Sequence, residues 1–88
     1  MTVLLYIGSD PKSHKLEMKK IMRYLRRNHS DFIVTGPRTA YWDNDTDEVA
    51  EIIINDTKAD IRKTMNYFNN KLHRRTSACS LEDLKYFD

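Results

Sequence analysis

The sequence predicts a small α/β protein of the α+β type, built as a two-layer sandwich of one sheet and two helices. Three observations support this fold class: a short apolar run at the N-terminus and two later stretches whose apolar residues recur with a helical period. We expect the order β-α-β-β-(β)-α, a three- or four-stranded sheet with both helices on one face, and a short C-terminal helix. In this chain of 88 residues, 1–76 should form a single small α/β domain, and 77–88 a linker and the short helix.

The N-terminal run from Val3 to Ile7 is expected to form the first strand. It is almost continuously apolar and ends at Gly8, a pattern typical of a buried, central strand. It has no basic leader and no small-residue cleavage site, so it does not resemble a signal peptide. The single cysteine, Cys79, excludes an internal disulfide, and no apolar run approaches the roughly 18 residues that span a bilayer. A cytoplasmic protein is the resulting expectation.

The segment from Pro11 to about Asn28 is expected to form the first helix. Asp10 at the N-cap and Pro11 at the first helical position are a strong start signal. A core-facing stripe has the spacing i, i+3, i+4, i+7 and consists of Met18, Ile21, Met22 and Leu25. The opposite side carries seven of the 15 basic residues within an arc of about 140°, namely Lys12, Lys15, Lys19, Lys20, Arg23, Arg26 and Arg27.

The middle of the chain is expected to form strands. Residues 31–35 and 38–42 would be two strands joined by a turn at Gly36-Pro37, and the polar residues 43–47 would form a loop. Residues 48–55 have apolar positions that would also fit a helix. Three successive isoleucines favour a strand, and a strand is our prediction there.

The second helix is expected to begin at Asp56 or Thr57, with Asp60 in a position that resembles a capping box. Its buried stripe would consist of Ile61, Met65, Phe68 and Leu72. After this helix, residues 76–78 resemble a linker, and residues 80–83 have the capping-box pattern that would start the short C-terminal helix.

With both helices on one face, the other face of the sheet would be uncovered. Strand alternation would place Leu4, Tyr6 and Ile53 there, together with either Tyr41 or Trp42. An apolar, aromatic face of this kind suggests a partner or a second copy of the chain. The aromatic residues Tyr6, Phe32, Tyr41 and Trp42 could instead stack on nucleic-acid bases or simply fill the core.

The basic helical face is the first candidate binding surface. The net charge is only +2, but it is unevenly distributed, because seven of the 13 acidic residues lie between Asp43 and Asp60. Only Glu17 offers an acidic partner within the helix, and like charges at i, i+4 repel each other. The residues expected to contact nucleic acid or an acidic partner are Lys15, Lys19, Lys20, Arg23, Arg26 and Arg27. The alternatives are a solvated helix exterior, or neutralisation of the face by residues 43–51.

The acidic segment 43–48 resembles the start of a calcium-binding loop. Glu48 stands where such a loop needs glycine, and Ile54 where it needs the final glutamate, so we predict no metal site. The three histidines have no metal-ligand spacing, and no motif indicates a cofactor or a catalytic group. A polar turn is the simplest interpretation of the segment.

These patterns predict a small non-catalytic binding or regulatory protein that acts on nucleic acid, or on a nucleic-acid-handling protein, through its basic helical face. The alternative is a protein–protein adaptor or inhibitor, including one encoded by a virus, that uses the acidic segment and the uncovered sheet face. It would act alone or as a homodimer, with contacts from Tyr6, Trp42, Asp43, Asp45 and Asp47. A third option is a metal-dependent enzyme that uses the three aspartates of this segment.

Overall fold

The computed structural model describes residues 1–9, 12, 15–43, 45–72 and 76–82. It contains a four-stranded antiparallel sheet and two helices, which confirms the expected fold class. The elements are β1 (Thr2–Gly8), α1 (Met18–Asn28), β2 (Phe32–Trp42), β3 (Asp45–Asn55), α2 (Lys58–Asn66) and β4 (Thr76–Ser80). A π-helical turn, Tyr67–Lys71, extends α2.

The strands lie in the order β2-β3-β1-β4, and every neighbouring pair is antiparallel. Strands β1 and β2 therefore run parallel with β3 between them, and β3 and β4 run parallel with β1 between them. Each of these split pairs is connected through one helix, so the chain consists of two interleaved β-α-β units, the ferredoxin-like topology.

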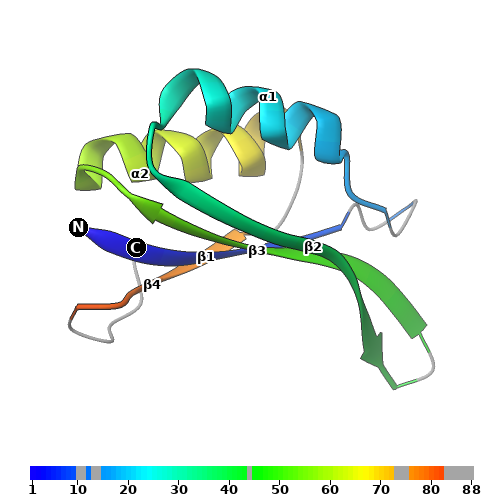
Figure 1. Ribbon diagram of the computed structural model, residues 1–88. Coiled ribbons are helices and arrows are strands. Elements are labelled where there is room, and N and C mark those ends of the chain that lie inside the picture. Colours follow the sequence, from blue (N-terminus) through cyan, green and yellow to red (C-terminus); the bar gives the residue numbers. More distant parts are fainter. Residues whose placement is uncertain (10–11, 13–14, 44, 73–75, 83–88) are drawn as a thin grey trace.

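Both helices cover the same face of the sheet, and the core lies between the two layers (Figure 1). Along β1, Val3, Leu5 and Ile7 are fully buried, whereas the alternate residues Leu4 and Tyr6 are partly exposed on the opposite face. Full burial of such side chains contributes about 1.5–3 kcal/mol each relative to exposure. The helices and β3 complete the core with Ile21, Leu25, Ile52, Ile54, Ile61 and Phe68.

Helix α1 begins later than the sequence predicts. Residues 15–17 are not helical, so a continuous helix from Pro11 is wrong, and the start signal at Asp10-Pro11 lies outside the described residues. Leu16 is buried, and its backbone N–H donates to Oε2 of Glu48 at 3.1 Å. This contact holds the segment against the sheet in a non-helical conformation, and the helix starts only at Met18.

Strand β2 is one continuous strand rather than the two that the sequence predicts. Gly36 and Pro37, expected as a turn, form a β-bulge in which two residues oppose the single residue Ala50 of β3. The Gly36-Pro37 peptide is cis, and Gly36 has a φ of 128°. The bulge lies on an edge strand, and edge strands and bulges are the places where a sheet accommodates proline.

Two further expectations are corrected. The predicted loop 43–47 shortens to a turn at Asp43, and Asp45 already begins β3, so most of the acidic segment is strand. Thr76–Ser80, expected in part as a linker, forms β4 and pairs with β1. Thus β4 supplies the fourth strand in place of the second half of β2. The predicted short C-terminal helix lies largely in residues 83–88, outside the described residues.

The strand predicted at 48–55 and the second helix are confirmed. Thr57 is the N-cap of α2, and its hydroxyl accepts a hydrogen bond from the backbone N–H of Asp60 at 3.2 Å. The predicted stripe faces the sheet, with Ile61, Phe68 and Leu72 buried and Met65 partly buried.

Candidate functional site

A groove on α1, open to solvent and about 550 Å³ in volume, lies on the basic helical face. Met18 and Met22 form its apolar part, and four cations lie along one side of them. We call these four residues, Lys19, Arg23, Arg26 and Arg27, the α1 basic surface.

Core contacts fix the rotation of α1 that presents this surface. Ile21 and Leu25 are fully buried against the sheet. On one flank of the helix, Tyr24 stacks on Tyr67 beside α2, with ring centroids 4.1 Å apart. These contacts occupy one side of the helix. Residues that lie about 100° or more beyond Leu25, on the side away from Tyr24, must therefore face outward. Met18 and Met22 are half-buried at the edge of the core, and the four cations point away from it.

The α1 basic surface is not neutralised by any described acidic residue. None of its four cations forms an ion pair or a side-chain hydrogen bond within residues 15–43, 45–72 and 76–82. Glu51 pairs instead with Arg38 at 3.8 Å, and Glu48 accepts from the backbone of Leu16. The neutralisation considered from the sequence is therefore not observed for these cations.

The structure brings together four of the six predicted contact residues. Lys15 precedes α1 and does not share its helical surface. Lys20 lies on the helix but pairs with Glu17 at 3.3 Å and does not line the groove. Lys12 also precedes the helix, so α1 carries five of the seven basic residues that the sequence assigned to it.

The alternative contact residues are spread over the sheet. Tyr6 lies opposite Glu51 of β3, whereas Trp42 lies opposite Asp45. These positions are six residues apart along β3, or about 20 Å. Asp43 occupies the turn at the hairpin end with a φ of 49°, and Asp47 lies two residues into β3 from Asp45. The end of the β2–β3 hairpin projects from the rest of the molecule (Figure 1). The three aspartates are thus gathered at this end, away from Tyr6 in the strand register.

The strand aromatics do not form a shared surface for base stacking. Phe32 lies opposite Ile54, and Tyr41 opposite Thr46, which places both on the helix-facing side of the sheet. Tyr6 lies on the other side, next to Glu51. Phe32 is partly buried against the core, while Tyr41 is exposed beyond it.

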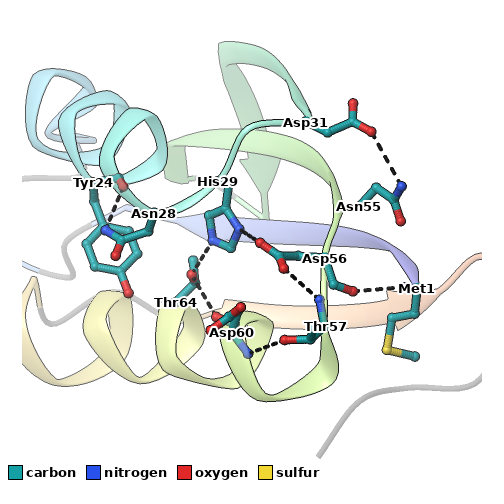
Figure 2. A network of polar contacts seen from close by, with 10 residues as sticks. All are labelled: Met1, Tyr24, Asn28, His29, Asp31, Asn55, Asp56, Thr57, Asp60 and Thr64. Carbon is teal, nitrogen blue, oxygen red and sulfur yellow. Dashed lines mark hydrogen bonds and ion pairs between the residues drawn. The ribbon is translucent and has the colours of Figure 1, made fainter.

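A buried polar cluster joins the end of α1, the end of β3 and the first turns of α2 (Figure 2). Nδ1 of His29 lies 2.7 Å from Oδ2 of Asp56, and its Nε2 lies 2.5 Å from the hydroxyl of Thr64. The backbone N–H of Thr57, at 2.7 Å, and then the ring of His29 hold the pKa of the Asp56 carboxyl below its usual value. The backbone of Met1 exchanges two hydrogen bonds with that of Asp56.

The order Asp56, His29, Thr64 has the connectivity of a hydrolase triad, but its hydroxyl is inaccessible. Thr64 has no exposed surface, and its hydroxyl donates to the carbonyl of Asp60 at 3.1 Å. The cluster therefore holds the two helices on the sheet. Sequence reasoning missed it because its members are separated by 27 and 35 residues and form no local pattern.

Comparison with known protein families, curated proteins and solved structures gave no match to this chain. Across the described residues, no three His, Cys, Asp or Glu side chains are grouped so that they could hold a metal ion. In the same part of the chain, neither helix has the length and apolar character that a membrane-spanning helix needs.

Proposed function

We propose that this protein is a non-catalytic binding or regulatory module that docks on an anionic partner through the α1 basic surface. The partner is a nucleic acid or a protein that handles nucleic acid. The observation that carries the proposal is the set of four cations on one helical surface without an acidic partner among the described residues.

Electrostatics favours such a use over a purely solvated surface. Lys19 and Arg23, and Arg23 and Arg27, are like-charged pairs at i, i+4, each destabilising a helix by about 0.2–0.5 kcal/mol. An anion that binds between them removes this repulsion. Three of the four cations are arginines, whose guanidinium groups can hold a phosphate or a carboxylate through two hydrogen bonds.

The test is binding of labelled single- and double-stranded DNA and RNA across a range of salt concentrations. If all four cations contact phosphates, log K should fall with log salt with a slope of about −3 to −4, a loss of about 100-fold between 50 and 200 mM. The double variant Arg23→Glu/Arg26→Glu should lose this binding. Polyglutamate, offered in parallel, represents the acidic-protein form of the partner.

A matched single reversal on the other helix serves as the control. Lys63 is exposed on α2 and makes no described ion pair, so Lys63→Glu changes the net charge as much as Arg23→Glu does. We expect only Arg23→Glu to weaken binding by tenfold or more. Equal losses in the two variants, or no binding of any polyanion at low salt, would contradict the proposal.

A second candidate function is a protein–protein adaptor or inhibitor that uses the uncovered sheet face. A row of side chains crosses all four strands on this face, because Ile33 pairs with Ile53, Ile53 with Leu4, and Leu4 with Cys79. Ile33 is 62% exposed, an unusual value for a large aliphatic side chain within a strand. This row favours an apolar partner, such as a second copy of the chain.

A further inference from the structure

The groove on α1 is lined by apolar as well as charged side chains, and the apolar ones indicate the class of partner. We propose that the groove binds an acidic amphipathic helix of a partner protein, with apolar side chains against Met18 and Met22 and carboxylates against the α1 basic surface. This inference rests on the proposed function, because it assumes that the α1 basic surface is a binding surface.

The two methionines are placed to receive an apolar side chain. They are spaced i, i+4, so they lie one above the other on the helix. Each packs partly against the core and leaves part of its thioether chain facing the groove. Methionine side chains are flexible and polarisable, and they adapt to the irregular apolar surface of a docked helix.

The cations lie along one border of this apolar stripe. On a helical projection, Arg26, Lys19 and Arg23 follow Met22 at successive steps of about 20–40°. On the other border, Ile21 and Leu25 are buried in the core. A docked helix would therefore need apolar residues on one stripe and acidic residues beside it, on the side that meets the cations. This is the arrangement of an acidic amphipathic helix.

Helix α1 has a length that suits such a partner. Its 11 residues span about 16 Å, which is three turns. Three turns of a docked helix present apolar anchors at i, i+3 or i+4, and i+7, enough to cover both methionines.

A nucleic acid uses this groove less completely. The methionine thioethers have no N–H or O–H donor with which to read a base edge. The aromatic residue of α1, Tyr24, is half-buried and stacks on Tyr67 rather than lining the groove. A phosphate backbone would thus occupy the cations and leave Met18 and Met22 exposed.

The experiment uses the full chain and a labelled synthetic peptide with about three repeats of Glu-Leu-Glu-Ala-Leu-Glu-Glu, whose leucines form one stripe on a helix. A second peptide with every leucine replaced by serine has the same charge and serves as the matched probe. Duplex DNA is the third probe. Three protein variants are compared. Met22→Gln keeps the length of the side chain but adds a polar amide, and Met22→Leu keeps the side chain apolar. The third variant is Arg23→Glu.

We expect the leucine peptide to bind at least about tenfold more tightly than the serine peptide. Met22→Gln should weaken the leucine peptide by about fivefold or more and leave DNA binding unchanged, whereas Met22→Leu should retain the peptide. Arg23→Glu should weaken every anionic probe. The comparison of the two peptides on the wild-type protein does not depend on the folding of any variant.

Equal affinity for the two peptides would overturn the inference while leaving the proposed function intact. Tight, salt-sensitive DNA binding without peptide binding would also overturn the inference and leave the proposed function intact. It would assign the groove to a phosphate backbone. If none of the three probes binds, both the inference and the proposed function are wrong.

Discussion

Asp56 connects more parts of the molecule than any other residue of the buried polar cluster. Its carboxylate accepts from the backbone of Thr57 and contacts the ring of His29, and its backbone bonds to Met1 (Figure 2). The side chain is 22% exposed, and that of His29 is fully buried. A partly open carboxylate can therefore exchange protons with solvent while it holds a ring inside the core.

This arrangement predicts how stability depends on acid. The pKa of Asp56 in the folded protein is lowered from its ordinary value of 3.8, first by the N–H of Thr57 and then by His29. The unfolded chain then binds the proton more tightly than the folded protein does. The stabilisation by the Asp56 carboxylate is fully present above about pH 4, and it is lost as pH falls through the lowered pKa.

We expect Asp56→Asn to be less stable than the wild type in urea at neutral pH, and the difference to shrink below about pH 4, as the wild-type carboxyl becomes protonated. Asp45→Asn is the control, because Asp45 is exposed at the start of β3. A stability difference that stays constant from pH 7 to pH 2 would contradict the role of the Asp56 charge.

At the scale of single elements, Gly36 decides the course of β2. Its φ of 128° lies in a region that residues with a side chain rarely adopt. A Cβ at this position would also lie 3.0 Å from the carbonyl oxygen of Val49 and 3.1 Å from the Cα of Ala50. Backbone atoms of the central β3 cannot move away, since β3 is hydrogen-bonded on both sides.

Gly36→Ala should therefore destabilise the protein by more than about 1 kcal/mol, through the strained φ and the close contact with β3. Urea denaturation followed by circular dichroism would measure the change. Thr39→Ala, on the exposed part of the same strand, should change stability by less than about 0.5 kcal/mol. An unchanged free energy of unfolding in Gly36→Ala would show that the bulge can rearrange without loss of stability.

The same element shows what local sequence patterns could and could not predict. The fold class, the central β1, the strand at 48–55 and the cap at Thr57 follow from periodicity and capping signals, which act between near neighbours. The dipeptide Gly36-Pro37 occurs in turns and in bulges, and only its pairing with β3 selects the bulge. Strand β4 has short polar and small residues, and it is a strand because β1 offers a free edge.

The candidate site was also predicted only in part. The basic face and its four central residues could be read from the helical projection. The late start of α1 could not, because it depends on the contact between Leu16 and Glu48, 32 residues apart in sequence. Met18 and Met22 belong to the predicted core-facing stripe and do pack against the core, but only in part. Periodicity does not tell how far a neighbouring element covers the edge of a helix.

The whole molecule presents two different surfaces on opposite sides of one sheet. Both helices lie on one side of the sheet (Figure 1), and that side carries the α1 basic surface. The other side carries the row of Ile33, Ile53 and Leu4. The sheet and the core between them separate the two surfaces. A partner bound on one side therefore need not displace a partner bound on the other.

This separation gives a prediction for Ile33→Gln, a substitution that removes the exposed apolar side chain and keeps the charge. Because Ile33 is largely exposed, the free energy of unfolding should change by less than about 0.5 kcal/mol. The affinity of the α1 basic surface for duplex DNA should stay within about twofold of the wild type, since the two surfaces share no residue.

In sedimentation equilibrium, a wild-type dimer formed through the open face should shift towards monomer in this variant. Arg23→Glu should show the reverse pattern, with weaker binding of DNA and an unchanged association state. Loss of DNA affinity in Ile33→Gln would mean that the ligand reaches round the sheet edge at β2, and a wild-type protein that stays monomeric at high concentration would remove the homodimer from the functions of the open face.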